Sequence, residues 1–148
     1  MPQIIDGKQI AMQIKEELKE RVARLNQEGK SVCLAVIQVG NDPASTVYVN
    51  GKKKDCAYIG IESRSYELPE KTKEEELLAL LDQLNHTGDV HGILVQLPLP
   101  SHMDESKVVK AIDPAKDVDG FHPVNIWEAF VSEGMALTAV HRLESFNF

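Results

Sequence analysis

The segment Ser31–Val39 constrains the fold more than any other part of the chain. It is almost continuously apolar and rich in β-branched residues, a pattern typical of a strand that is covered on both faces. Such strands belong to parallel sheets with helices packed on each side. The sequence therefore predicts a buried strand here, within a parallel sheet.

Helical segments are predicted on both sides of this strand. Before it, apolar residues recur every three or four positions and form one stripe: Ile10, Ile14, Leu18, Val22 and Leu25. After it, Asp42 is suited to cap a helix, Pro43 to occupy its first position and Gly60 to end it. We therefore expect one amphipathic helix before the strand and a second helix after it.

The rest of the chain continues the alternation. We expect a strand over 61–68, a leucine-rich helix that opens with a capping box of Thr72 and Glu75, a strand over 92–97 and a short helix over 105–112. Strands that alternate with helices favour right-handed crossovers and helices on both faces of the sheet. The predicted fold class is α/β, as a three-layer α/β/α arrangement with a mainly parallel sheet.

Composition limits the partners of the chain. It has 148 residues and a formal net charge of −7, whereas a surface that follows nucleic-acid phosphates needs clustered lysine and arginine. Its two cysteines and scattered histidines lack metal-ligand spacing, and no apolar run reaches the ~20 residues of a membrane span. We therefore expect a cytoplasmic protein that binds no metal, no nucleic acid and no membrane.

Candidate functional residues lie at or after the ends of the predicted strands, where parallel α/β sheets bind ligands. Tyr48 and Lys52 are four residues apart and share one face of the second helix. A lysine beside other lysines is suited to proton transfer when its pKa lies near the working pH. The alternative is a solvated basic helix turn, and spacing alone favours it.

Two further candidates occur later in the chain. Gln96, at the end of an apolar strand, is either a satisfied structural amide or a residue that orients a ligand. Asp117 and Asp119 in D-V-D-G fit a surface turn best, with a metal-binding pair or a ligand-binding carboxylate as alternatives. His102 and His122 are candidate contacts on the same rim. The chain has no G-x-G-x-x-G motif, so it encodes no dinucleotide cradle of that kind.

Three blocks of sequence are more specific together than any single residue. They are G-N-D-P-A-S leading to Y-V-x-x-K-x-K, then G-I-L-V-Q-L-P-L-P, then P-x-K-D-V-D-G-F-H-P-V-N, and they begin at Gly40, Gly92 and Pro114. Over about residues 3–126 the chain closely resembles the bifunctional methylenetetrahydrofolate dehydrogenase/methenyltetrahydrofolate cyclohydrolase family, FolD. Three matching blocks in the same order argue against a chance likeness.

The resemblance implies a role for each candidate residue. It implies that Lys52 is the acid/base of the cyclohydrolase step, that Gln96 orients Lys52, that Tyr48 lies along the folate ring and that Asp119 binds the donor edge of the pterin. These four are the expected catalytic residues. The expected substrate-binding set consists of the same four together with Val95, Leu97 and Pro98.

The resemblance also implies an activity. Family members oxidise 5,10-methylenetetrahydrofolate to 5,10-methenyltetrahydrofolate with NADP or NAD, hydrolyse the product to 10-formyltetrahydrofolate, and form homodimers. We therefore expect an enzyme of one-carbon folate metabolism with a small-molecule folate substrate. The cofactor of the family, NADP or NAD, binds a separate Rossmann domain, so we expect no cofactor-binding residue in this chain.

Beyond Ile126 the resemblance ends. Family members continue into P-C-T-P and a Rossmann domain, whereas this sequence continues W-E-A-F-V-S. We expect a catalytic domain over 1–126 and a divergent tail over 127–148, truncated or frame-shifted, which weighs against the dehydrogenase step in this chain. The family's C-terminal helix has no counterpart, so we expect an exposed apolar face. The alternative function is an inactive folate-binding or self-associating fragment.

Overall fold

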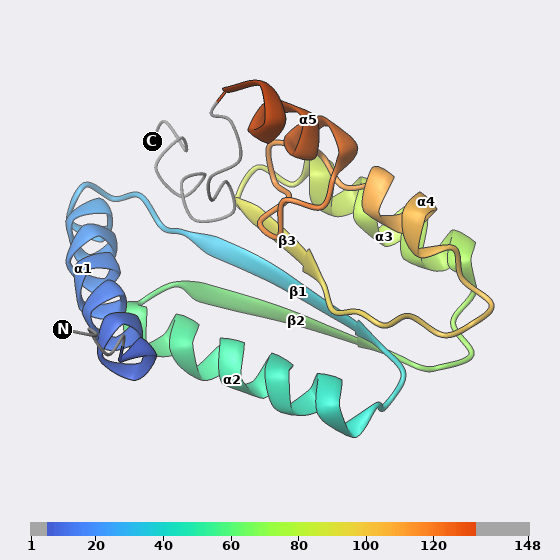
Figure 1. Ribbon diagram of the computed structural model, residues 1–148, viewed down its shortest axis with the longest axis horizontal. Coiled ribbons are helices and arrows are strands. Elements are labelled where there is room, and N and C mark those ends of the chain that lie inside the picture. The colour runs from blue at the N-terminus through green and yellow to red at the C-terminus, as the bar shows by residue number, and fades with distance from the viewer. Residues whose placement is uncertain (1–5, 133–148) are drawn as a thin grey trace, which may run out of the picture.

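The computed structural model describes residues 6–132, and Figure 1 shows a twisted sheet with helices on both of its faces. The elements are α1 (Gly7–Gln27), β1 (Cys33–Val39), α2 (Pro43–Ile59), β2 (Glu62–Leu68), α3 (Glu74–His86), β3 (Gly92–Val95), α4 (Glu105–Lys110) and α5 (Pro123–Ser132). Helices and strands alternate from the first helix to α4, as predicted, and a further helix, α5, follows α4 directly.

Strand β1 is the centre of the sheet. The strand order is β2-β1-β3, and both neighbours run parallel to β1. Ala35 of β1 pairs with Arg64 on one side and with Ile93 on the other. Past β3, Asp117 forms a single parallel bridge with Ile93. The prediction of a buried strand in a parallel sheet is confirmed.

The two faces of β1 belong to different core clusters. Ile37 lies in the larger cluster with Leu81 of α3. Val36 lies in a second cluster with Val49 of α2 and Leu94 of β3. Because successive side chains of a strand point to opposite faces, α2 and α3 must cover opposite faces of the sheet, as Figure 1 shows. The predicted three-layer α/β/α arrangement is confirmed.

The predicted boundaries of α2 are also confirmed. Asp42 Oδ2 accepts a hydrogen bond from Ser45 N at 2.7 Å, and Pro43 is the first helical residue. Gly60 ends the helix with φ +94°, a conformation that glycine adopts without steric cost. This helix matters for function because it positions Tyr48 and Lys52.

The predicted capping box of α3 is wrong by one residue. Glu76, and not Glu75, accepts a hydrogen bond from the backbone N–H of the cap residue, Lys73, at 3.2 Å. Thr72 is buried, and its carbonyl accepts a hydrogen bond from His102 Nε2 at 2.8 Å. A tertiary contact therefore involves the residue that the local pattern assigns to the cap.

The apolar stripe of α1 is buried at one end alone. Val22 is buried, whereas the side chains of Ile10 and Ile14 are 46% and 43% exposed. The contact between α1 and α2 includes an ion pair from Lys15 Nζ to Asp55 Oδ1 at 2.6 Å. The N-terminal part of this apolar stripe is thus exposed among the described residues.

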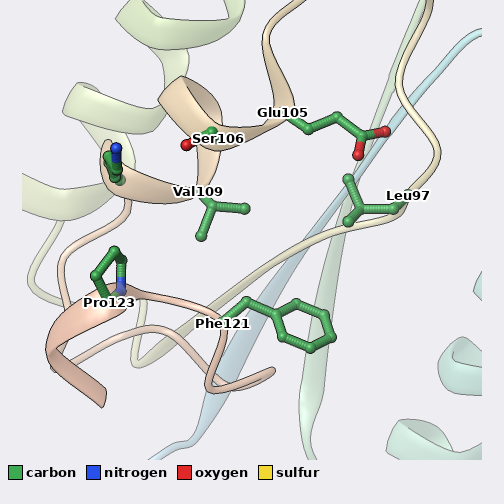
Figure 2. Close-up of a pocket in the computed structure, with 7 residues that line it drawn as sticks. Leu97, Glu105, Ser106, Val109, Phe121 and Pro123 are labelled. Carbon is green, nitrogen blue, oxygen red and sulfur yellow. The ribbon is translucent and has the colours of Figure 1, made fainter. Parts of the chain in front are cut away.

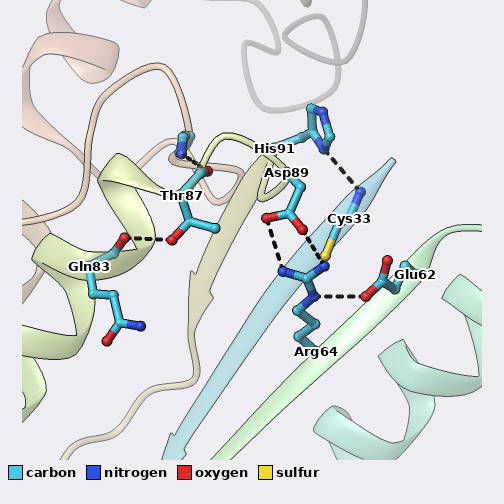
Figure 3. Close-up of polar contacts among 8 residues, drawn as sticks. Cys33, Glu62, Arg64, Gln83, Thr87, Asp89 and His91 are labelled. Atoms are coloured by element: carbon cyan, nitrogen blue, oxygen red, sulfur yellow. Dashed lines mark hydrogen bonds and ion pairs between the residues drawn. The ribbon is translucent and has the colours of Figure 1, made fainter. Parts of the chain in front are cut away.

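A network of polar side chains lies at the end of the sheet where the strands begin (Figure 3). Arg64 of β2 donates to Asp89 Oδ1 and Oδ2 at 3.1 and 2.7 Å, and to Glu62 Oε1 at 2.7 Å. Cys33 N donates to His91 Nδ1 at 3.2 Å. Since Asp89 lies between α3 and β3, the bidentate pair joins β2 to the segment that leads into β3, across β1.

Candidate functional site

The four residues predicted to be catalytic come from three segments of the chain. Tyr48 and Lys52 lie on α2, which follows β1. Gln96 directly follows β3, and Asp119 lies in the loop between α4 and α5. Because parallel strands end at the same edge of a sheet, segments far apart in sequence meet there.

Lys52 and Gln96 are in direct contact. Lys52 Nζ donates to Gln96 Oε1 at 3.2 Å, and Gln96 Nε2 donates to the carbonyl of Leu97 at 2.8 Å. The backbone N–H of Gln96 donates to the carbonyl of Ile37 at 2.8 Å, which ties this residue to β1. The amide oxygen is thereby directed at the lysine, and two ammonium hydrogens remain for a ligand or water.

Asp119 is half-buried and electrostatically coupled to Lys52. Burial raises the pKa of the Asp119 carboxyl above its ordinary value, the Lys52 ammonium lowers that pKa, and the Asp117 carboxylate raises it. Its two oxygens are suited to accept hydrogen bonds from adjacent N–H groups of a flat heterocycle. We call Lys52, Gln96 and Asp119 the Lys52 cluster.

Tyr48 lies one helical turn before Lys52. Its side chain is 66% exposed and that of the preceding Val47 is 70% exposed. The spacing of four residues places Tyr48 and Lys52 on one helix face, as predicted. An exposed ring beside an ammonium group offers a flat apolar surface to an aromatic ligand.

The three predicted substrate-binding residues around Gln96 have different surroundings. Val95 is buried in the core cluster that includes α3, Leu97 is half-buried and Pro98 is exposed. Strand β3 ends at Val95, earlier than the predicted end at Leu97. Leu97 and Pro98 thus present side-chain surface near Gln96, while the side chain of Val95 supports the segment from the core.

A cavity of about 280 Å³ lies next to Leu97 (Figure 2). Its lining comes from the segment after β3, from α4 and from the start of α5: Leu97, Glu105, Ser106, Val109, Lys110, Phe121 and Pro123. No residue of the Lys52 cluster lines this cavity. The cavity therefore adjoins the cluster through Leu97 without containing it.

The two carboxylates of D-V-D-G have different surroundings in the structure, although the sequence pattern does not distinguish them. Asp117 is 4% exposed and accepts hydrogen bonds from the backbone N–H groups of Gly120 and His122. Asp119 is the carboxylate that interacts with Lys52. The predicted turn is present at Asp117, and the ligand-binding alternative remains for Asp119 alone.

The two histidines proposed as rim contacts take part in local structure. His102 Nε2 donates to the carbonyl of Thr72 at 2.8 Å. His122 Nδ1 accepts a hydrogen bond from Val124 N at 3.2 Å, at the first turn of α5. These bonds give both histidines a structural role in this part of the fold.

Comparison with known proteins identifies the family. Residues 5–119 match the family model described as the catalytic domain of tetrahydrofolate dehydrogenase/cyclohydrolase. This chain belongs to that family. The bifunctional protein FolD of Lachnoclostridium phytofermentans is 64% identical over 126 residues, and that of Agathobacter rectalis is 61% identical over the same length. Each match covers 85% of this chain and 45% of the relative.

Solved structures of family members share the fold. The bifunctional enzyme FolD of Campylobacter jejuni has a TM-score of 0.85 and 48% identity, over 89% of this chain and 47% of that one. The Trypanosoma brucei enzyme, solved with NADP cofactor and an inhibitor, has a TM-score of 0.83 and 37% identity, over 88% and 46%. The chain thus spans about half the length of the FolD relatives that it matches.

The N-terminus of α2 in this FolD-family chain does not fit a phosphate group. The sequence lacks a glycine-rich phosphate turn, and the N-terminus of α2 is capped by the Asp42 carboxylate, which accepts the Ser45 N–H. A carboxylate at that position repels a phosphate and occupies a donor that a phosphate would need. Within residues 6–132, no group of three or more His, Cys, Asp or Glu is placed to hold a metal ion, and no helix is both long and apolar enough to span a bilayer.

Proposed function

We propose that this chain binds a reduced folate and supplies the cyclohydrolase residues of its family. The observation that supports this most directly is the 3.2 Å hydrogen bond from Lys52 to Gln96, with the Asp119 carboxylate coupled to the same ammonium. An oriented amine next to a carboxylate that can hold a heterocycle is the minimum for acid/base work on a bound pterin.

Each group of the site has a part in the proposed binding mode. Asp119 accepts hydrogen bonds from two adjacent N–H groups of the pterin and so fixes its orientation. The exposed ring of Tyr48 lies along the folate, and Leu97 and Pro98 add apolar surface beside Gln96. In this proposed binding mode the methenyl carbon lies near Lys52.

The proposed reaction is the hydrolysis of 5,10-methenyltetrahydrofolate to 10-formyltetrahydrofolate. A water oxygen bonds to the cationic methenyl carbon and loses one proton. The bond from that carbon to one ring nitrogen then breaks as the nitrogen takes up a proton, and the hydroxyl loses its remaining proton to give the formyl group, so that one proton is released to solvent overall. In the proposed reaction Lys52, held by Gln96, accepts the first proton as the neutral amine and then, as the ammonium, donates a proton to the nitrogen. Acid/base groups in position typically accelerate such steps by about 10²–10⁴-fold.

For the dehydrogenase reaction we assign the folate half alone to this chain. NADP is the hydride acceptor of that reaction, and the acid-capped N-terminus of α2 does not fit its phosphates. We therefore assign the binding of the nucleotide to a part that lies outside residues 6–132.

The test follows the decay of methenyltetrahydrofolate absorbance with the purified chain. Lys52→Met should lower the catalysed rate at least tenfold relative to the unsubstituted chain, on the scale of about 10²–10⁴ for a lost acid/base group. Lys54→Met is the matched control, since Lys54 is exposed on the same helix. An unchanged rate in Lys52→Met would remove Lys52 from the mechanism, and no rate in the unsubstituted chain would contradict catalysis by it.

A second candidate function is folate binding or self-association without catalysis. Three large apolar side chains on or next to α5 favour it, since Phe121, Trp127 and Phe130 are 55%, 69% and 65% exposed. Two copies that buried this surface would form a homodimer. Sedimentation over a range of concentrations, combined with turnover assays, decides: a dimer without turnover supports this candidate, and a monomer with turnover supports the first.

We also propose a cytoplasmic location and a catalytic domain over residues 1–126. The thiols of Cys33 and Cys56 are free and buried, which suits a reducing compartment. The family match over 5–119 supports the domain. Helix α5 continues through the proposed boundary to Ser132, and the rest of the proposed tail lies outside the described residues.

A further inference from the structure

The most densely hydrogen-bonded side chain near the Lys52 cluster is the carboxylate of Asp117. Its Oδ1 accepts a hydrogen bond from Gly120 N at 3.1 Å. Its Oδ2 accepts from His122 N at 2.9 Å and from Asn125 Nδ2 at 2.8 Å. Both oxygens of a buried charge are therefore used, as a buried carboxylate requires.

The three donors enclose Asp119 in a short loop. Gly120, with φ +70°, directly follows Asp119; His122 directly precedes α5, and Asn125 lies in the first turn of that helix. The Asp117 carboxylate thus hydrogen-bonds both to the turn after Asp119 and to the first turn of α5. An ordinary aspartate turn uses one nearby N–H, so this arrangement is more than turn formation requires.

The side-chain amide of Asn125 donates both of its hydrogen bonds within this network. Its Nδ2 donates to Pro114 O at 3.1 Å as well as to Asp117, while its buried Oδ1 has no partner among the described residues. Leaving a buried acceptor unpaired carries a cost of desolvation. The donor end of Asn125 therefore has the structural role, and that role is to bind Asp117 and the loop.

The other side of the loop is attached to the sheet and to α3. Ile93 N donates to the carbonyl of Lys116 at 2.7 Å. Lys116 Nζ donates to the carbonyls of Leu84 and Thr87, each at 2.9 Å, at the C-terminal end of α3. Lys116 thus fixes the start of D-V-D-G, Val118 packs on the core cluster of Val36, and Asp117 binds the part of the loop that follows Asp119.

We propose that Asp117 is the positioning residue of the site: through its bonds to Gly120, His122 and Asn125 it holds the Asp119 carboxylate next to Lys52. The inference rests on the proposed folate site for its effect on ligand binding. Its effect on the electrostatic interaction between Asp119 and Lys52 is measured in the chain without ligand, so that part of the inference does not depend on the proposed function.

The test measures that coupling with and without Asp117. The carboxyl titration of Asp119 is followed by NMR in four chains: unsubstituted, Lys52→Met, Asp117→Asn and the double variant. Because Lys52 lowers the pKa of Asp119, Lys52→Met alone should raise it. In the Asp117→Asn background we expect this rise to shrink by about half or more, since the two groups are no longer held together.

The double-variant comparison separates positioning from charge. The lost charge of Asp117 shifts the Asp119 pKa by itself, but this direct effect cancels when the two Lys52→Met shifts are compared. Asp113→Asn is the matched control, because Asp113 accepts one bond, from Ala115 N at 2.8 Å, in the same loop. An equal Lys52→Met shift in both backgrounds would overturn the proposal.

Ligand binding is measured on the same proteins with tetrahydrofolate. Asp117→Asn should weaken binding at least tenfold, whereas Asp113→Asn should change it less than twofold. Should Asp117→Asn fail to fold, Asn125→Ala replaces it as the background, with a smaller loss of coupling expected and an unchanged coupling again contradicting the proposal. If the unsubstituted chain binds no tetrahydrofolate, the proposed function fails, while the titration still decides the role of Asp117.

Discussion

Lys52 of α2 and Gln96 after β3 are 44 residues apart in sequence and share a hydrogen bond of 3.2 Å. The central strand makes this contact possible, because α2 follows β1 and the carbonyl of Ile37 in β1 accepts the N–H of Gln96. The lysine is thus oriented by a backbone that belongs to the core of the fold.

Gln96→Met should reduce the proposed cyclohydrolase activity without unfolding the chain. Methionine has a similar length but offers only a weak sulfur acceptor in place of the amide oxygen, so the Lys52 ammonium loses its fixed direction. We expect kcat to fall by about 10–100-fold. Steady-state hydrolysis of methenyltetrahydrofolate, together with thermal unfolding, measures both effects. Gln83→Met, at an exposed position of α3, is the control, and a kcat equal to that of the unsubstituted chain would contradict an orienting role for Gln96.

Local sequence patterns predict elements whose decisive contacts are local. The cap of α2 is one example, because the Asp42–Ser45 bond closes within the first turn of the helix. The box predicted at Thr72 is wrong by one residue, because the cap residue is Lys73 and its backbone N–H donates to Glu76. Local patterns place a helix start only to within one or two residues.

The geometry of the candidate site, like the helix boundaries, could be predicted from the sequence only where the contacts are local. Helical spacing alone shows that Tyr48 and Lys52 share a face, whereas the contact of Lys52 with Gln96 depends on the sheet and was expected from family resemblance alone. Asp117 and Asp119 are separated by one residue, so no periodicity distinguishes them. What distinguishes them is the set of N–H groups that the folded loop directs at Asp117.

Asp119→Asn should stabilise the fold at neutral pH and weaken folate binding. Burial raises the pKa of Asp119 in the folded state above its ordinary value of 3.8, so the folded state binds this proton more tightly than the unfolded state. The free energy of unfolding therefore decreases as the pH rises from 3.8 through the folded-state pKa. Asparagine carries no charge, so the free energy of unfolding of the variant does not decrease in this pH range on account of position 119.

Urea unfolding of both proteins over a series of pH values checks this sign. The stability advantage of Asp119→Asn should grow as the pH rises and vanish in acid, where Asp119 is protonated in both states. Tetrahydrofolate affinity should fall in the same variant, because an amide presents one acceptor where the carboxylate presents two. Greater stability of the unsubstituted chain at neutral pH would show that the Lys52 interaction outweighs burial.

Asp89→Asn should destabilise the fold at neutral pH, and the effect should disappear in acid. Hydrogen bonds from Arg64 lower the pKa of Asp89 below its ordinary value of 3.8 (Figure 3). A carboxylate of this kind contributes stability that is present above its ordinary pKa and lost as the pH falls through its folded-state pKa. Because the pair is partly exposed, the contribution is small and decreases with added salt.

Urea midpoints at low and high salt measure this contribution. Asp82→Asn, on an exposed part of α3, is the matched substitution and should leave the midpoint nearly unchanged. Equal midpoints for Asp89→Asn and the unsubstituted chain at neutral pH and low salt would mean that the Arg64 network does not hold β2 to the segment before β3.

Gly92→Ala should destabilise the fold and displace the loop that contains Asp119. A Cβ on Gly92 would lie 2.6 Å from Val118 Cγ1 and 3.1 Å from Leu34 Cδ1. Val118 is β-branched and has few alternative rotamers, so the loop must move, and over-packing of this kind costs ~1–3 kcal/mol. Since Val118 directly precedes Asp119, tetrahydrofolate affinity should fall together with stability.

The double variant Gly92→Ala/Val118→Ala should recover much of both losses, because alanine at position 118 removes the clashing methyl group. A double-mutant cycle in urea should give a coupling of about 1 kcal/mol or more. Gly51→Ala is the matched control: its added Cβ has no neighbour within 4 Å outside its own helix backbone, and helix propensity predicts a gain of up to ~1 kcal/mol. If Gly92→Ala proved as stable as Gly51→Ala, the D-V-D-G loop would not be held against β3, and the close approach at Gly92 would have no part in placing Asp119.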